Sequence, residues 1–286
     1  MALQSNFLVS SKRLADQQDI AFLSSPMEWC APMLGSAALY LLDLADRLFE
    51  NGFGLSEATP FHIAFQATQP VFVKSAVIEK RNSHDATWNS FRQFVSTFLY
   101  PLLVNSRLGK NLDEVYTQFP NGLAVADVYR MIGPIRRWLP PYFPLVTVPT
   151  LLAHRSISYR AKLCGSPREA GFVFRRLTGF LRKQVELIQS DRGSAKLNVG
   201  KVEKRLLEQK SGRVLILGQN GTDAAIQFAA KGWRVVAADA DRDGTSRLWR
   251  AARSKKLDLL PLVVSEIKMA EFLKRAAGKF DLVVKR

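Results

Sequence analysis

The chain has 286 residues, 47% of them apolar, and a formal net charge of +16 at pH 7. This length and apolar content can form a substantial core, which excludes a disordered chain and suggests two domains. Cys30 and Cys164 lie far apart, without CxxC or CxxxH spacing, so neither a disulfide framework nor a zinc site is indicated. No run reaches the roughly 18 apolar residues of a membrane-spanning helix. We therefore expect a cytoplasmic protein.

The positive charge is unevenly placed along the chain. Residues 1–100 carry 7 basic and 9 acidic side chains, residues 101–200 carry 15 and 6, and residues 201–286 carry 19 and 10. A basic surface attracts an acidic partner, nucleic acid or an anionic membrane surface, and salt weakens the attraction. The same composition also fits a solvated cationic face that keeps the protein soluble.

Apolar periodicity predicts helices and a hairpin in the first half of the chain. Residues 33–51 repeat apolar side chains at helical spacing before Asn51-Gly52. Two short apolar runs, 61–65 and 70–74, flank a turn-like segment and predict a β-hairpin. Residues 87–104 predict another amphipathic helix, and residues 111–138 predict two helical pieces separated by Pro120-Asn121-Gly122.

The middle of the chain is rich in proline and then in arginine. Four prolines between residues 139 and 152 argue against a regular helix there, so we expect a packed or interfacial connector. Residues 168–190 predict a basic amphipathic helix, and the polar, glycine-containing stretch after it predicts a flexible linker at about 190–200.

From Arg213 onward, strands and helices alternate. The expected strands are 213–217, 233–238, 258–264 and 280–285, and alternation of this kind makes a parallel sheet with right-handed crossovers. The sequence thus predicts an α/β protein in which a mostly helical domain with a small β-hairpin precedes a partial Rossmann-like parallel sheet. The expected divisions are an extension at 1–25, the helical domain at 26–190, a linker or helix at 191–210 and the sheet domain at 211–286.

The first two strands of this sheet carry the pattern of a nucleotide-cofactor site. Gly218 ends the first strand, Gly221 follows after a short loop, and Asp239 ends the second strand 21 residues after Gly218. Glycines let the backbone approach a ligand closely, and a carboxylate at a strand tip can accept hydrogen bonds from ribose hydroxyls. The spacing fits S-adenosylmethionine or a dinucleotide, but the middle glycine that admits a pyrophosphate is absent, which favours S-adenosylmethionine.

Two structural interpretations of the same residues remain open. The glycines can serve only a tight strand-to-helix turn. Asp239 can serve as a helix N-cap, and Asp241 or Asp243 could equally take that role.

Several segments carry a family resemblance. The stretches 214–221, 236–241 and 260–265 resemble the first three motifs of class I S-adenosylmethionine-dependent methyltransferases. Pro26-Met27-Glu28-Trp29, residues 88–94 and Tyr100-Pro101-Leu102-Leu103 are similar to the N-terminal region of a bacterial methyltransferase-like family with an extra helical domain, which includes rhizobial nodulation-type proteins.

The resemblance implies S-adenosylmethionine as cofactor and assigns roles to individual residues. Asp239 would hold the ribose hydroxyls, and Ser265 would stand where the family has an aspartate facing the adenine amine. Ile216 replaces the acidic residue of the first motif. The loop under the methionine and ribose would consist of Gly218, Gln219, Asn220 and Gly221.

The sequence stops in what resembles the fourth strand of the methyltransferase sheet. We therefore expect a C-terminally truncated, weakened or inactive methyltransferase-like protein with an unknown methyl acceptor and no assignable catalytic residue. An exposed sheet edge at residues 281–284 could mediate a homodimer. The alternative is a non-catalytic interaction protein that binds an acidic partner or anionic surface through its basic C-terminal two thirds.

The hairpin region resembles the catalytic-loop and metal-loop hairpin of a kinase-like fold. The places of the catalytic acid and the two metal ligands hold Glu57, His62 and Lys74. A lysine in a metal-ligand position repels the ion, so phosphoryl transfer is disfavoured and the hairpin is interpreted as architecture. The histidines have no partners at metal-binding spacing, and no metal site is expected.

Overall fold

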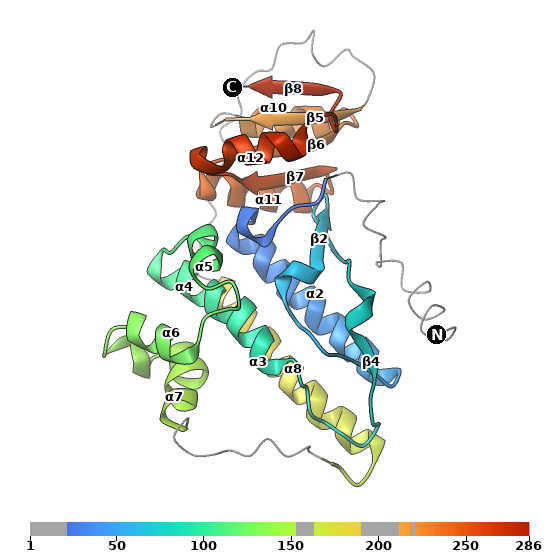
Figure 1. Ribbon diagram of the computed structural model, residues 1–286, viewed down its shortest axis with the longest axis vertical. Helices are drawn as coiled ribbons and strands as arrows, with labels where there is room; N and C mark the ends of the chain where they lie inside the picture. The colour runs from blue at the N-terminus through green and yellow to red at the C-terminus, as the bar shows by residue number, and fades with distance from the viewer. Residues whose placement is uncertain (1–21, 153–162, 190–211, 219–220, 286) are drawn as a thin grey trace. The chain divides into compact units, whose positions relative to one another are not determined.

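The computed structural model describes residues 22–152, 163–189, 212–218 and 221–285 (Figure 1). The chain divides into two compact units. The sheet unit comprises Met1–Met33, Ile63–Val73 and Gly193–Arg286, and the helical unit comprises Leu34–His62 and Lys74–Arg192. The predicted linker at 190–200 and residues 1–21 of the predicted extension at 1–25 lie outside the described residues, and the predicted domain limits stay a prediction.

Two long helices, α2 (Ala31–Glu50) and α8 (Pro167–Gln189), confirm the predictions for 33–51 and 168–190. Polar side chains of the helical unit link them. The Arg182 guanidinium lies 2.6 Å from Asp43 and 3.2 Å from Asp46, and the Thr178 hydroxyl donates to Asp46 at 2.7 Å. Burial raises the pKa of the Asp46 carboxyl above its ordinary value, and the bonds from Thr178 and Arg182 oppose that rise.

The helix predicted for 87–104 is present but shifted. It comprises α3 (Phe91–Phe94), the π-turn η5 (Val95–Leu99) and α4 (Tyr100–Leu108), and it ends at Gly109 with φ +69°. The start lies later than predicted because residues before Phe91 form a turn, in which the Asp85 carboxylate accepts the Thr87 N–H at 2.8 Å. The π-turn leads directly into α4. Pro101 lies in the first turn of that helix, a position that tolerates proline.

The two predicted pieces of 111–138 are α5 (Leu112–Gln118) and α6 (Val125–Met131), followed by the short η6 (Arg136–Trp138). The connector predicted without a regular helix is in fact helical over its second half. It comprises the π-turn η7 (Phe143–Thr147) and α7 (Val148–Leu152). Proline is compatible with this segment because Pro144 lies in the first turn of η7, where a missing backbone N–H breaks no helical hydrogen bond. The π-turn also departs from the regular α-helical hydrogen-bond pattern.

A second antiparallel strand pair was not predicted. Strands β1 (Phe53–Leu55) and β4 (Ile78–Lys80) of the helical unit pair in register from Phe53 with Lys80 to Leu55 with Ile78. Each has three residues, too few for an alternating pattern to show in the sequence. The short turns η3 (Pro60–His62) and η4 (Ser75–Val77) complete this region.

The sheet unit confirms the predicted strands and their parallel arrangement. In chain order it contains β5 (Arg213–Leu217), α10 (Gly221–Ala230), β6 (Arg234–Asp239), α11 (Arg242–Ser254), β7 (Leu259–Val263), α12 (Glu266–Ala276) and β8 (Leu282–Lys285). The strand order is β7-β6-β5-β8, with every neighbouring pair parallel. The fourth strand, β8, pairs with the first, β5, as in other Rossmann-like sheets.

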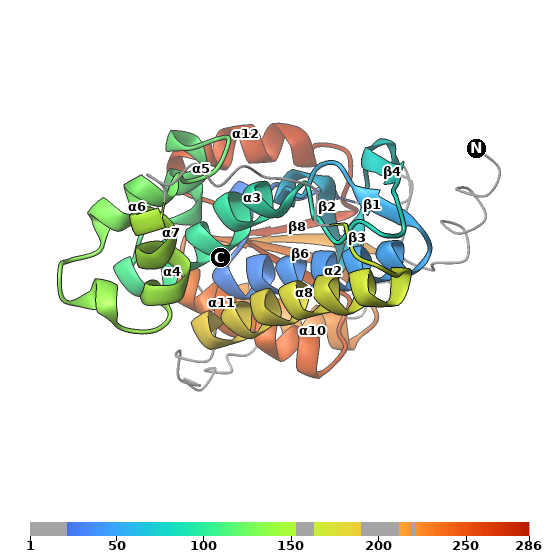
Figure 2. The same ribbon diagram turned by 90° about the horizontal axis from the view of Figure 1, so that it is seen from below.

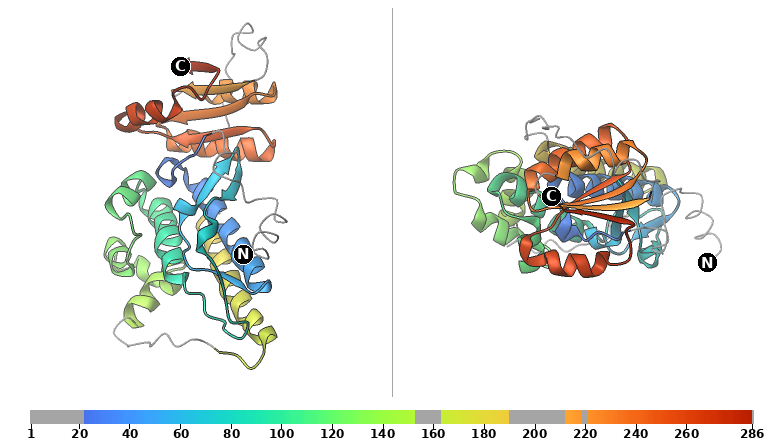
Figure 3. Two further views of the ribbon diagram at one scale, coloured as in Figure 1. Left: turned by 45° about the vertical axis from the view of Figure 1, so that its right-hand side comes forward. Right: turned by 90° about the horizontal axis from the view of Figure 1, so that it is seen from above.

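Helices cover both faces of this sheet. Helices α10 and α11 lie on one face and α12 on the other (Figures 2 and 3). Alternate strand residues form the core under α10 and α11, where Val214 and Ile216 pack with Phe228 and Ala252. With its helices, parallel sheet and small antiparallel strand pairs, the chain is an α/β protein.

The predicted hairpin exists as β2 (Ile63–Gln66) paired with β3 (Gln69–Phe72), and both strands belong to the sheet unit. The Phe65 ring packs edge-on against Trp29 at 4.9 Å and against Trp249 of α11 at 5.1 Å. The turn η2 (Pro26–Glu28) is tied to α12 by an ion pair between Glu28 and Arg275. Three stretches far apart in the sequence therefore share one core.

Candidate functional site

The carboxyl ends of β5 and β6 form the predicted site. Gly218 follows β5 with φ +109°, a conformation that side-chain-bearing residues avoid, and its N–H donates to the Ala238 carbonyl at 3.2 Å. This bond holds the turn against the neighbouring strand. A glycine is therefore required here by the backbone, whatever the turn binds.

Asp239 is the last residue of β6, and its Oδ1 accepts the Asp241 N–H at 2.8 Å. Asp241 is the N-cap of α11, and its Oδ1 accepts the Asp243 N–H at 3.0 Å. The structure thus gives the capping role to Asp241, so capping does not explain an aspartate at position 239. The bond from Asp241 orients the Asp239 carboxylate at the strand tip.

A small hollow of about 10 Å³ brings Gly218 and Asp239 together. A cavity of this size holds about one water molecule. Ile216 is 1% exposed and belongs to the core under α10 and α11 as well as to this wall. The floor is therefore mostly apolar, and it is formed by Ile216, Gly218, Ala237, Ala238, Asp239, Thr245 and Leu248.

Ser265 lies at the end of the next strand and does not line the hollow. It occupies the N-cap position of α12, where its side chain makes no capping hydrogen bond. The adjacent Val264 N–H donates to the Asp239 carbonyl at 2.9 Å, which brings the two strand ends together. Gly221 begins α10, and Gln219 and Asn220 lie outside the described residues.

The described residues fit one part of a nucleoside cofactor. A strand-end carboxylate beside a glycine turn has the chemistry to accept hydrogen bonds from two vicinal hydroxyl groups. The hollow itself has room for a water and not for a base and sugar. This chemistry matches the ribose end of a nucleoside, and the ribose-binding role of Asp239 stays a prediction.

The three residues of the kinase-like comparison meet in the helical unit. The Glu57 carboxylate lies 3.1 Å from His62 Nε2 and 3.5 Å from the Lys74 ammonium. Burial lowers the pKa of His62, the Lys74 charge lowers it further, and Glu57 opposes both. Lys74 thus lies beside the acidic residue where a kinase would hold a metal ion. Nowhere in the described ranges do three or more His, Cys, Asp or Glu side chains gather as a metal site.

Two further hollows were not predicted from the sequence. One, of about 100 Å³, lies in the sheet unit and includes Arg213, Arg234 and Asp258 at the amino ends of the strands. The other, of about 230 Å³, lies in the helical unit beside Arg81 and Trp88. No motif marks either, because their walls come from residues scattered along the chain.

Comparison with known proteins gives one informative similarity. The nodulation protein NoeA of Rhizobium meliloti (strain 1021) is 29% identical to this chain over 137 residues, which is 48% of the chain. The chain covers 28% of that protein's length. No protein-family model matches the chain, and no solved structure matches it significantly.

Of the described helices, none combines the length and apolar character needed to cross a bilayer. The similarity to a rhizobial nodulation protein supports the relationship to the nodulation-type methyltransferase-like proteins that the sequence resembles.

Proposed function

We propose that this chain is a cytoplasmic methyltransferase-like protein that binds S-adenosylmethionine at the carboxyl ends of β5 and β6. The observation that carries the proposal is that Gly218 and Asp239 line one hollow on adjacent parallel strands. Ligands of parallel α/β sheets bind outside the carboxyl ends of the strands. The similarity to a nodulation protein adds support.

Each residue has a defined role in this proposal. The Asp239 carboxylate accepts hydrogen bonds from the ribose hydroxyls, and the Ser265 hydroxyl faces the adenine amine. The bound cofactor supplies an electrophilic methyl group, and the chain contributes binding and orientation toward an acceptor. Ile216 offers no charge where the resembled family has an acidic residue, so binding is weak. The loop against the ribose and methionine comprises Gly218, Gln219, Asn220 and Gly221.

Titration calorimetry with S-adenosylmethionine and its demethylated product tests the proposal. We expect weak, saturable binding that Asp239→Ala abolishes, because the substitution removes the ribose acceptor. Asp243→Asn is the matched control, since Asp243 is an exposed carboxylate of the same helix-strand junction outside the hollow.

Absence of heat at millimolar ligand would contradict the proposal, as would binding that Asp239→Ala leaves unchanged. NAD that binds more tightly than S-adenosylmethionine would favour the dinucleotide interpretation of the same glycine turn.

A second candidate function is attachment to an anionic membrane surface, and an apolar patch in the helical unit favours it. This apolar patch consists of Ile135, Trp138, Leu139 and Phe143, which are 81%, 62%, 55% and 39% exposed. The residues adjoin one another, since the Trp138 and Phe143 rings lie 5.9 Å apart and the Phe143 N–H donates to the Leu139 carbonyl at 3.1 Å.

The segment that carries the apolar patch is basic, although Arg130 forms an ion pair with Asp127 at 3.4 Å. Residues 129–152 contain Arg130, Arg136 and Arg137 and no carboxylate. Exposed tryptophan and aliphatic side chains flanked by arginine suit the interface of a bilayer with anionic headgroups. The opposite charges make an anionic lipid surface the favoured occupant.

Sedimentation with lipid vesicles tests this second function. We expect binding to phosphatidylglycerol vesicles that exceeds binding to phosphatidylcholine vesicles and falls at least about tenfold in the double variant Ile135→Ser, Trp138→Ser. Phe172→Ser removes an equally exposed aromatic side chain of α8 and serves as control. Equal binding to both lipids, or an unaffected double variant, would exclude the membrane role.

A further inference from the structure

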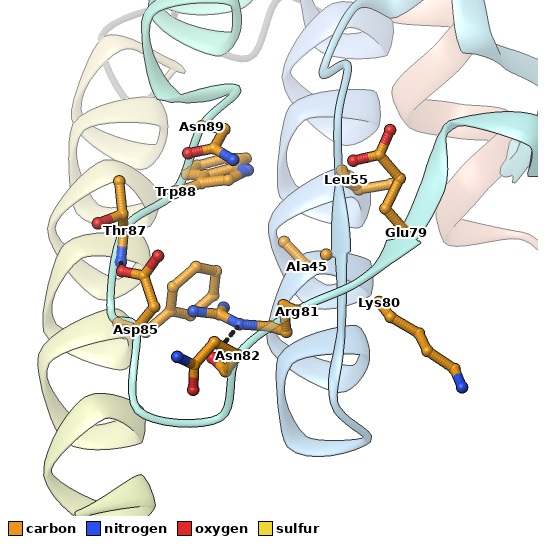
Figure 4. Close-up of a pocket in the computed structure, with 12 residues that line it drawn as sticks. Ala45, Leu55, Glu79, Lys80, Arg81, Asn82, Asp85, Thr87, Trp88 and Asn89 are labelled. Atoms are coloured by element: carbon orange, nitrogen blue, oxygen red, sulfur yellow. Dashed lines mark hydrogen bonds between the residues drawn. The ribbon is translucent and has the colours of Figure 1, made fainter. Parts of the chain in front are cut away.

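A polar pocket of about 230 Å³ lies wholly within the helical unit (Figure 4). Asp85, Thr87 and Asn89 lie on one side, Leu55 and Glu79 lie across from them, and Arg81 extends between the two sides (Figure 4). Lys80 points away from the pocket (Figure 4). The remaining walls are Ala45, Gly54, Asn82, Trp88 and Phe174.

Trp88 lines this pocket and carries a buried donor. The side chain is 4% exposed, and its indole Nε1 has no hydrogen-bond partner among the described residues. The ring is fixed by Phe94 at 5.3 Å and Phe174 at 6.1 Å, so it does not turn to reach solvent. A buried N–H without an acceptor is uncommon in native proteins and points to a group that the pocket receives.

Arg81 presents a second donor, with a charge. Its guanidinium lies 3.7 Å from the centre of the Phe49 ring and 5.5 Å from that of Phe174, which holds it between aromatic faces. Its Nε contacts the Asn82 carbonyl at a long 3.5 Å. Burial lowers the pKa of Arg81, and Asp85 counteracts this only in part. The cation is partly removed from water without a close ionic partner at the described residues.

The pocket also offers carboxylates to a ligand. Glu79 and Asp85 both line it, and Asp85 is oriented by the bond that its Oδ1 accepts from Thr87. A ligand carrying only negative charge would be repelled by these two groups. A ligand with an anionic end for Trp88 and Arg81 and a cationic end for Glu79 or Asp85 satisfies both sets.

We propose that this pocket binds a small zwitterion of the α-amino acid class, with its carboxylate on Trp88 and Arg81 and its ammonium on Glu79 or Asp85. The pocket volume of about 230 Å³ suits a ligand of this small size, because pockets for larger, drug-sized ligands measure roughly 300 to 1,000 Å³. The site is independent of the one proposed for S-adenosylmethionine, since its walls belong to the helical unit.

The test measures binding of the common L-amino acids to the full chain, one at a time, by thermal shift and calorimetry. We expect at least one to bind saturably, and its carboxamide, which lacks the anionic end, to bind at least about tenfold more weakly. Trp88→Phe keeps the ring and removes the N–H, and we expect at least about a tenfold loss of affinity; Arg81→Gln, which removes the charge, should do the same. Lys80→Ala, whose side chain points away, should bind as the parent does.

Circular dichroism checks that each variant folds. Asp239→Ala should bind the amino acid as the parent does, because Asp239 belongs to the proposed cofactor site and not to this pocket. No binding of any amino acid at millimolar concentration would overturn the proposal. So would an amide that binds as well as the acid, or a folded Trp88→Phe with unchanged affinity.

Discussion

The thiols of Cys30 and Cys164 lie in different surroundings. Cys30 is 3% exposed, and Cys164 is partly exposed. Burial raises the pKa of the Cys30 thiol to about 11, while hydrogen bonds from the Met33 backbone and the Ser246 side chain oppose the rise. The reactive species is the thiolate, so Cys30 is protected both by burial and by its protonation state.

We therefore predict that Cys164 reacts quickly with a thiol reagent in the native protein near pH 8 and that Cys30 does not. Cys164→Ser should abolish the fast phase, and Cys30→Ser should leave it intact. In the denatured protein, both thiols should react with the reagent at similar rates. Two fast phases in the native parent would contradict the burial of Cys30.

The raised pKa of Cys30 also has a consequence for stability. The folded value lies above the ordinary value of 9.0, so the contribution of the neutral thiol is complete below pH 9 and is lost as the pH rises toward about 11. We expect the urea midpoint of the parent to fall more between pH 8 and pH 11 than that of Cys30→Ala. Equal pH dependence of the two proteins would show that folding does not raise the pKa of this thiol.

At the scale of elements, the hairpin of β2 and β3 is a structural part of the sheet unit. Phe65 is 1% exposed and joins Trp29 and Trp249 through edge-on ring contacts. Its removal would leave a cavity among three segments that only tertiary contacts hold together.

We predict that Phe65→Ala lowers the free energy of unfolding by about 3–5 kcal/mol and Phe65→Leu by less than half of that. Phe61→Ala in the adjacent turn is the control, since Phe61 is 42% exposed. Urea unfolding followed by tryptophan fluorescence measures the difference. Similar effects of Phe65→Ala and Phe61→Ala would contradict the central position of Phe65.

Strand β8 stands at the end of the described strand order, with its outer side unpaired in the described sheet. Val283 is 51% exposed, and Lys285 is the only charged side chain of the strand. An apolar edge strand pairs readily with another chain. The homodimer expected from the sequence stays a proposal that this edge supports.

We predict a concentration-dependent dimer that Val283→Lys weakens, because a charge on an edge strand opposes pairing. Light scattering over a concentration series measures it, with Lys285→Ala as a variant that should not weaken the dimer. Hydrogen exchange over residues 282–285 should slow on dimerisation. A monomer with strong protection at these residues would show that another element covers the edge.

At the scale of the whole molecule, charge is the property that most affects association. Of the 41 basic residues, 34 lie after residue 100, and they occur without a recognisable base-reading module. Attraction of this kind follows the polyanion charge and not its sequence.

We expect heparin and mixed-sequence DNA to compete for the protein with similar affinity, and both affinities to fall steeply between low and physiological salt. Filter binding at several salt concentrations provides the measurement. A specific DNA site bound at least about a thousandfold more tightly than random sequence would instead identify a sequence-reading protein.

The sequence by itself determined the regular parts of this protein. Apolar periodicity is strong in α2 and α8, and the alternation of apolar strands with helices from Arg213 onward leaves a parallel sheet as the favoured arrangement. Gly218 and Asp239 could be singled out because a glycine turn and a strand-end carboxylate are local features with a known spacing. These predictions succeed where neighbours in sequence decide the conformation.

Tertiary structure alone decided the features made by distant residues. It gathered Glu57, His62 and Lys74 into one cluster and formed a pocket beside Arg81 and Trp88. It also paired the three-residue strands β1 and β4 and made residues 143–152 helical despite their prolines. The cluster, the pocket and the strand pair depend on hydrogen bonds or packing between segments that no local pattern connects, so they became visible only once the chain was folded.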